Sequence, residues 1–457
     1  MTLHAAARTS WQAMACICLA GAAARAEAAL SLPRTLIYVD PVDYERALIL
    51  ETCELQGLKT VQLWSAPYAE MIRNRMVLND EQIEHLASHT APPENFETEW
   101  AQQNLEEFPV LGVLCGSDAG LATAERLQHV LTPSRSNGIL SARRDKLQMN
   151  EALSAAGLST AAQASISSWE EAEAFLTALP APLHAVVKPR RGQSSLRVGL
   201  ATSLSQARHM VNALLETPTS LDSSEVPRGS ALLQEYLRGD EWVVDTVSRA
   251  GEHKAVALWR YNKGPANGAP FVYAYDELMS VEGSRERDLI EYAFSALEAL
   301  QWRYGPCHIE IKWTERGPVL VEVNAGRFNG VDFKLLVDAL IGYNMYDATL
   351  AAYADEAAWE SLPRLPPQQL RGAGRLVKLV SSVQGSLVQL RHVQEVESLP
   401  SCVAFAPVYT EEGEAVELTV DLASVAGFVT LMHEDAAVVQ QDYLRLRELQ
   451  ETMFEVK

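Results

Sequence analysis

The sequence predicts an α/β (α+β) protein, and three stretches of the chain lead to this prediction. Strand-like and helix-like segments alternate between Thr35 and Val130, which is typical of a parallel sheet covered by helices. Between Leu232 and Asn324, strand-like segments rich in β-branched residues follow one another, which indicates antiparallel pairing. A proline-rich linker at residues 363–367 then leads to short strands and a final amphipathic helix.

Length and charge narrow the class of protein. A chain of 457 residues is long enough for two or three domains. The formal net charge of the chain is −21. Nucleic acids and anionic membranes bind to basic surfaces, so we expect neither as a partner. Local clusters of cations would still allow an acidic protein to bind phosphates. The six cysteines show no zinc-site spacing and are too few for a disulfide scaffold, so we expect reduced thiols.

Residues 1–34 are set apart as a leader or a disordered extension. An apolar run from Trp11 to Ala24 is too short to span a bilayer. It is compatible with a secretory h-region, with an organelle transit peptide, or with a plain N-terminal extension. The predicted location of the protein is nevertheless the cytoplasm.

The first predicted domain covers residues 35–138. Apolar runs predict three strands, and the segments between them predict helices. The strands are expected at Thr35–Asp40, Thr60–Trp64 and Val110–Cys115, and helices at Tyr44–Leu55 and Leu121–Val130. The turn-rich segment at 132–138 closes this domain.

The second predicted domain covers residues 139–370, and two lysines in its first part are candidates for binding a phosphate. Ser141 is expected to cap a helix that ends at Leu153, and this places Lys146 in a basic cluster at the helix start. The strand His184–Pro189 ends with Lys188 before a turn rich in serine and arginine. Such a turn presents an ammonium and backbone N–H groups to a phosphate, although it also suits an ordinary hairpin.

The stretch from Gly305 to Gly330 predicts a β-hairpin with opposed acids. If its loop is the three residues 315–317, Glu310 lies opposite Glu322 and His308 opposite Asn324, all on one face. Directly opposed carboxylates repel each other unless a cation lies between them. Two carboxylates and an amide oxygen are ligands that suit Mg²⁺. A solvated hairpin without a metal is the alternative interpretation.

These motifs, taken in order, resemble the ATP-grasp superfamily and in particular its L-amino acid ligase-like branch. The resemblance covers the chain from about Thr35 to the C-terminus. It implies an N-terminal parallel pre-grasp domain, an ATP-grasp module with antiparallel sheets, and a small C-terminal domain at 371–457. It also implies a nucleotide site, in which Lys146 and Lys188 reach the phosphates. The implied nucleotide-binding residues are Lys146, Lys188, Ser194, Ser195, Gln234, Glu235, Leu237 and Glu241.

By the same resemblance, the hairpin holds the metal. Glu310, Glu322 and Asn324 are the implied Mg²⁺ ligands, with Mn²⁺ as an alternative ion. Arg327 and Lys188 are the implied catalytic residues, with Arg327 steadying the phosphate or the oxyanion. The sequence departs from the family pattern at two points, because Gly326 displaces the arginine by one residue and the phosphate lid at residues 194–198 lacks its usual glycines.

The resemblance implies an ADP-forming carboxylate–amine ligase that forms an amide or peptide bond through an acyl phosphate. The expected substrates are a small carboxylate, which we expect to be an amino acid, and an amine. A homodimer is compatible with the family. Two alternatives stay open. One is an ATP-grasp ligase for a carboxylate other than an amino acid, in natural-product or cofactor biosynthesis. The other is a non-catalytic ATP-binding module.

Overall fold

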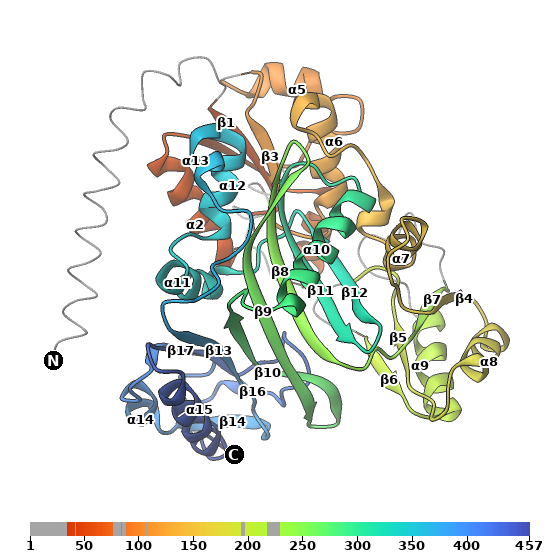
Figure 1. The fold of residues 1–457 in the computed structure, drawn as a ribbon, viewed down its shortest axis with the longest axis vertical. Coiled ribbons are helices and arrows are strands. Elements are labelled where there is room, and N and C mark those ends of the chain that lie inside the picture. Colours follow the sequence, from red (N-terminus) through yellow and green to blue (C-terminus); the bar gives the residue numbers. More distant parts are fainter. Residues whose placement is uncertain are drawn as a thin grey trace.

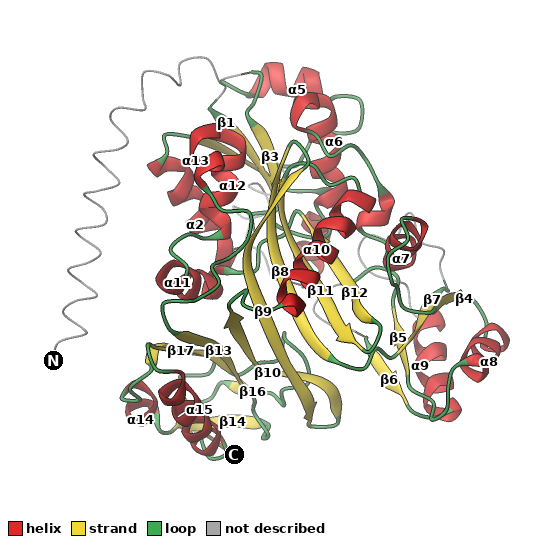
Figure 2. Cartoon of the chain, in the orientation of Figure 1, coloured by secondary structure: helices red, strands yellow, loops and turns green. Residues whose placement is uncertain are grey.

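The computed structural model of the chain describes residues 34–41, 43–75, 84, 88–106, 108–192, 197–216 and 229–457. Four sheets with surrounding helices make up this part of the chain (Figures 1 and 2). The leader predicted at residues 1–34 lies outside the described residues except for Arg34. No helix among the residues described is long and apolar enough to cross a membrane.

The N-terminal sheet is parallel, as the strand–helix alternation predicts. Its strands lie in the order β2-β1-β3, and both pairings are parallel. The strands are β1 (Thr35–Val39), β2 (Lys59–Leu63) and β3 (Gly112–Cys115). The accompanying helices are α2 (Asp43–Leu55), α3 (Ala66–Arg75), α5 (Glu97–Asn104) and α6 (Leu121–Leu131).

An eight-stranded antiparallel sheet forms the centre of the molecule, in the order β12-β11-β8-β9-β10-β13-β17-β15. The strands from the predicted ATP-grasp module are β8 (Asp240–Arg249), β9 (Glu252–Ala266), β10 (Ala269–Met279), β11 (Gly305–Thr314) and β12 (Gly317–Ala325). The others are β13 (Ala373–Leu379), β15 (Cys402–Pro407) and β17 (Gly427–His433). The central sheet therefore continues past residue 371 into strands of the C-terminal part.

A smaller four-stranded sheet stands to one side of the central sheet, on the right in Figure 1. Its antiparallel order is β4-β7-β5-β6. The strands are β4 (Gln163–Ile166), β5 (Ala185–Lys188), β6 (Gly199–Ala201) and β7 (Ala231–Glu235), with helices α8 (Trp169–Ala178) and α9 (Leu204–Glu216). Both helices pack on this sheet through buried alanine, valine and leucine side chains.

Further helices cover the central sheet, and a third small sheet lies near the C-terminus (Figure 2). The helices are α10 (Ser284–Ala299), α11 (Val331–Leu340), α12 (Met345–Ala354), α13 (Glu356–Ser361), α14 (Val393–Glu397) and α15 (Ala436–Gln450). The small sheet contains β14 (Gly385–Leu390), β16 (Ala415–Val416) and β18 (Phe454–Val456).

The helix that carries Lys146 begins later than predicted. Residues Ser141–Arg143 form a 3₁₀ turn, and helix α7 spans Lys146–Ala155. Asp145 caps it, because its carboxylate accepts the N–H groups of Leu147 (3.0 Å) and Gln148 (3.3 Å). The prediction that Ser141 caps a helix starting there is therefore wrong. The later start puts Lys146 in the first helical position.

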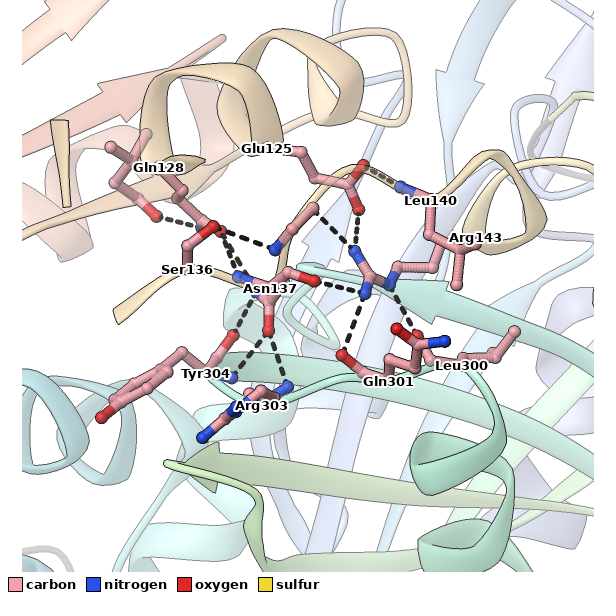
Figure 3. Close-up of polar contacts among 12 residues, drawn as sticks. Glu125, Gln128, Ser136, Asn137, Leu140, Arg143, Leu300, Gln301, Arg303 and Tyr304 are labelled. Carbon is pink, nitrogen blue, oxygen red and sulfur yellow. Dashed lines mark hydrogen bonds and ion pairs between the residues drawn. The ribbon is translucent and has the colours of Figure 1, made fainter. Parts of the chain in front are cut away.

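A buried polar network joins the N-terminal part to the central sheet (Figure 3). Arg143 forms an ion pair with Glu125 (2.6 Å) and donates to the carbonyls of Leu300 and Gln301 at 2.8 and 2.9 Å. The Asn137 amide oxygen accepts the backbone N–H groups of residues 303 (2.7 Å) and 304 (2.8 Å). The predicted boundary segment at 132–138 is therefore held against the end of α10.

Candidate active site

Every predicted site residue that the structure describes lines one cavity of about 830 Å³. These residues are Lys146, Lys188, Gln234, Glu235, Leu237, Glu241, Glu310, Glu322, Asn324 and Arg327. They come from the four-stranded sheet, from the central sheet, from helix α7 and from the connections after β7 and β12. Ser194 and Ser195 lie outside the described residues.

The acid hairpin has the predicted register. Glu310 pairs with Glu322, and His308 pairs with Asn324. The loop, however, is the two residues 315–316, because Thr314 already pairs with Gly317, so the predicted three-residue loop is wrong. A bulge at Val321 restores the expected pairing, since it inserts one residue into β12 before Glu322. Gly317 has the expected left-handed backbone, with φ at +86°.

The opposed carboxylates lie beside a lysine. Lys146 Nζ is 2.7 Å from Glu322 Oε1, and it also donates to the carbonyl of Gly192 at 2.7 Å. Asn324 Nδ2 donates only a long hydrogen bond of 3.4 Å to Glu310 Oε1. Burial raises the pKa of Glu322, and the charge of Glu310 adds to this effect while Lys146 opposes it. The acid pair therefore lies beside a buried lysine, and the burial of Glu322 still outweighs the stabilisation that Lys146 gives to its charge.

The donor set fits a hard divalent cation only in part. Among the described residues, no group of three or more His, Cys, Asp or Glu side chains has the arrangement of a metal site. The predicted set offers two carboxylates and an amide oxygen, so water and phosphate oxygens would have to complete the coordination. Mg²⁺ beside a nucleotide is bound in this way, by one or two carboxylates with substrate phosphates. The residues present thus fit a metal that arrives with a nucleotide.

Lys188 stands at the end of β5 and is almost fully buried. Burial and the charge of Lys146 lower its pKa to about 8, although Glu322, Glu310 and Glu241 pull in the other direction. The site therefore places two lysines close to one another, and their mutual repulsion adds to the cost of burying Lys188. An anion such as a phosphate would relieve that repulsion.

Glu241 is held between two lysines that sequence analysis missed. Its carboxylate pairs with Lys263 through Oε1 and with Lys312 through Oε2 at 3.0 Å. Burial works against the charge of Glu241, but the lysines outweigh it and lower its pKa to about 2. Lys312 lies two residues after Glu310 on the same face of β11, so the strand period alone could have found it. Lys263 comes from β9, and no local spacing points to it.

The end of β7 and the connection after it carry the predicted nucleotide-binding residues Gln234, Glu235 and Leu237. Glu235 N–H donates to the carbonyl of Ala162 at 2.9 Å, and its carboxylate accepts the N–H of Ala162 (3.0 Å). That carboxylate also accepts from Arg316, at the tip of the acid hairpin, at 2.6 Å. The Gln234 side chain donates to Gln163 at 2.9 Å. The side chain of Glu235 thus links the four-stranded sheet to the tip of the acid hairpin.

Arg327 faces the cavity despite the extra Gly326. Gly326 has a left-handed backbone with φ at +73°, which turns the chain at the end of β12. Arg327 Nε then lies 3.9 Å from Asp118 Oδ1, which belongs to the connection after β3. Both side chains line the cavity. The N-terminal sheet therefore contributes an acidic group to the surroundings of Arg327.

His308 and Asp245 are a further pair that sequence analysis did not assign to the site. His308 Nδ1 is 2.8 Å from Asp245 Oδ1, and Asn329 Nδ2 donates to Asp245 Oδ2 at 2.6 Å. Burial opposes the charge on His308, but the hydrogen bond and charge of Asp245 prevail and raise its pKa. Strand pairing brings the two residues together, because Asp245 on β8 lies directly opposite His308 on β11.

Comparisons with known proteins identify relatives of this domain and fold. Residues 181–334 match the family model described as an ATP-grasp domain. The chain is 25% identical over 365 residues to dapdiamide A synthase of Enterobacter agglomerans. The matched region covers 79% of this chain and 84% of that protein. The fold resembles the crystal structure of L-amino acid ligase from Bacillus licheniformis, with a TM-score of 0.69, 16% identity and coverage of 93% and 100% of the two chains.

A second solved structure has the same fold. It is the biotin carboxylase domain of 2-oxoglutarate carboxylase from Hydrogenobacter thermophilus, in complex with MgADP, ADP and bicarbonate. The TM-score is 0.58 at 12% identity, and the match covers 93% of this chain and 91% of that chain. The fold, the domain match and the cavity define an ATP-grasp enzyme. Within that class, the chain is related to the carboxylate–amine ligases, which form carbon–nitrogen bonds.

Proposed function

We propose that this chain is an ADP-forming ligase that activates a carboxylate with ATP and joins it to an amine, with an amino acid as one substrate. The observation that carries the proposal is the single cavity that contains Lys146, Lys188 and the opposed acids Glu310 and Glu322. The names of its relatives, an L-amino acid ligase and a dapdiamide synthase, support an amide-forming reaction. Small molecules are the substrates that a cavity of this kind accepts.

The proposed nucleotide site lies between the four-stranded sheet and the central sheet. Lys146 and Lys188 bind the phosphates, and the backbone of Glu235 and Leu237 binds the adenine. Gln234 lies beside this segment, and we assign Ser194 and Ser195 to the phosphate lid. Glu241 is proposed to hold the ribose, which requires its carboxylate to exchange part of its contact with Lys263 or Lys312.

Mg²⁺ is the proposed metal, with Mn²⁺ as the alternative, and Glu310, Glu322 and Asn324 would hold it. When bound, the ion supplies positive charge next to the transferring phosphoryl group. Before the nucleotide binds, Lys146 pairs with Glu322 and takes the place of the metal beside this carboxylate. A phosphate would draw Lys146 toward itself and free Glu322 for the metal.

The chain's own residues then have the following proposed roles. A carboxylate oxygen of the substrate attacks the γ-phosphorus of ATP, and ADP leaves. Lys146 and Lys188 neutralise the charge that moves in this step. The nitrogen of the amine attacks the acyl carbon, phosphate leaves, and the nitrogen loses a proton. Arg327 stabilises the oxyanion that forms on the acyl group. The aromatic walls near Phe328 keep water away from the acyl phosphate.

The other parts of the proposal concern organisation and location. We propose domains at 35–138, 139–370 and 371–457, a cytoplasmic location, and a homodimer as the assembly to be tested. Neither nucleic acid nor membrane is part of the proposed function.

Phosphate release tests the function. Purified protein is incubated with Mg²⁺-ATP and pools of the common amino acids, and phosphate is measured with and without each pool. A ligase releases phosphate only when both a carboxylate and an amine are present. Release with other carboxylates but with no amino acid would favour the alternative ligase. ATP binding without release from any pool would favour a non-catalytic module.

A further inference from the structure

The cavity extends beyond the residues assigned above to strands β10, β13 and β17. Asp276 on β10 pairs with Leu376 on β13, and Lys378 lies two residues along β13 on the same face. Lys378 in turn pairs with Phe428 on β17. All four side chains line the cavity. This end of the cavity is therefore built partly by strands that follow the proline-rich linker.

Asp276 and Lys378 form a buried ion pair at this end. Their exposed fractions are 1% and 2%, and Lys378 Nζ pairs with Asp276 Oδ2. Aromatic rings surround the ammonium, at 5.3 Å from Phe333, 5.8 Å from Tyr273 and 5.9 Å from Tyr261. A buried ion pair is costly unless further hydrogen bonds satisfy its remaining donors and acceptors.

Those further hydrogen bonds are missing among the described residues. Asp276 Oδ1 accepts no hydrogen bond, and Lys378 Nζ makes none beside its ion pair with Asp276. An acceptor and a donor with unused capacity thus lie next to each other, buried in two residues that line the cavity. Buried polar groups in native proteins are nearly always satisfied, so a ligand is the natural partner for both.

We propose that Asp276 and Lys378 bind a neutral amide-type group, a carbonyl beside an N–H, at the end of the substrate remote from the reacting carboxylate. The carbonyl oxygen accepts from Lys378, and the N–H donates to Asp276. A neutral group suits this place because the ion pair is itself neutral and the walls are aromatic, so neither charge needs an added counter-charge. This inference rests on the proposed ligase function.

The position of the pair sets the length of that substrate. Strand β10 is three strand spacings from β11, in the order β11-β8-β9-β10. At about 4.8 Å per spacing, the backbones are about 14 Å apart. The recognised amide therefore lies several bonds away from a carboxylate that reacts near Glu310, so an elongated acid is required.

Three probes of matched length test the proposal. Nε-acetyl-L-lysine carries the amide, L-2-aminononanoic acid replaces it by methylenes, and 2,7-diaminooctanedioic acid places a zwitterion at the far end. Binding is followed as the shift in melting temperature with MgADP present, and turnover as phosphate release with Mg²⁺-ATP and hydroxylamine. Because the melting shift needs no turnover, failure of the ligase function and failure of this inference give different results.

Two double variants complete the experiment. Asp276→Leu with Lys378→Met removes the pair without leaving a single buried charge. Glu277→Gln with Arg375→Met is the matched control, since that ion pair (2.8 Å) joins the same two strands at the neighbouring position. The wild type and the control are expected to bind the acetyl-lysine at least about tenfold more tightly than the methylene probe. The Asp276/Lys378 variant should lose or reverse this preference.

Three results would overturn the inference. The first is equal binding of the amide and methylene probes by the wild type. The second is an amide preference that survives in the Asp276/Lys378 variant, and the third is tighter binding of the zwitterion than of the amide. Phosphate release that fails with every probe, while the amide preference in binding persists and depends on the pair, would instead overturn the ligase function alone.

Discussion

Glu241 and Asp276 are the two cross-strand neighbours of Tyr261, one on each side, in a single row across the central sheet. The same row continues to Lys312 beyond Glu241 and to Leu376 beyond Asp276. Residues of one row project from the same face of a sheet. One face of the sheet thus connects the proposed ribose-binding residue with the proposed far end of the substrate site, and Tyr261 separates the two.

The acid hairpin gives the first prediction. Replacing Glu310 or Glu322 by Gln keeps the shape and removes a charge, so the metal and the phosphoryl group lose their support. We expect phosphate release to fall by about 10²–10³-fold, the usual effect of removing one electrostatic group from an active site. Glu315→Gln at the exposed hairpin tip is the control and should keep full activity. Equal activity of all three variants would contradict the metal assignment.

Lys188 gives a prediction on pH. Its pKa of about 8 means that the ammonium is charged below pH 8 and neutral above it. We expect kcat/KM for ATP, which reports groups of the free enzyme, to fall about tenfold per pH unit above that value. In Lys188→Arg the side chain stays charged, so this fall should disappear even if the activity is lower. A fall that persists unchanged in the arginine variant would assign it to another group.

Glu45 links stability to pH. Burial raises its pKa from 4.5 to about 7, with Arg327 opposing and Asp118 adding to the effect. Because the folded form keeps the proton longer, stability falls between pH 4.5 and 7 and is flat above. Over this pH range the free energy of unfolding falls by about 3 kcal/mol. Glu45→Gln should therefore raise the melting temperature at pH 8 but hardly at pH 5, whereas Glu54→Gln, exposed on the same helix, should do neither. Similar melting shifts at both pH values would refute the role of Glu45.

The network of Figure 3 predicts a large loss of stability. Arg143→Met leaves Glu125 as an unpaired buried charge and removes donors from several carbonyls. We expect a cost of about 3–5 kcal/mol, measured as a lower melting temperature. Arg364→Met breaks an exposed pair with Glu291 (2.6 Å) and should cost about 1 kcal/mol or less. Comparable losses of stability in the two variants would show that the network does not hold the N-terminal part against the central sheet.

Local patterns explain which parts of the site were predictable. Lys188 at a strand end and the opposed Glu310 and Glu322 follow from strand period and turn residues alone. Their pairing was predicted with a loop one residue too long, and the bulge at Val321 compensates for the difference. A bulge leaves no clear signal in sequence, since any residue of the strand could be the extra one.

The rest of the site depends on pairing between distant strands. Lys263 reaches Glu241, and Lys378 reaches Asp276, only because β9 and β13 lie where they do in the central sheet. No spacing along the chain predicts such neighbours. Similarly, the sequence places Arg143 only near the start of a predicted helix, and the fold alone brings Glu125 and the end of α10 around it.

Oxygen transfer from the substrate tests the central claim most directly. The protein is incubated with Mg²⁺-ATP, an amine and amino acids labelled with ¹⁸O in the carboxylate, and the released phosphate is analysed by mass spectrometry. A ligase that forms an acyl phosphate transfers one labelled oxygen to phosphate for each amide bond made. Phosphate without label, formed together with an amide, would contradict the acyl phosphate, and the absence of any amide would contradict the ligase function.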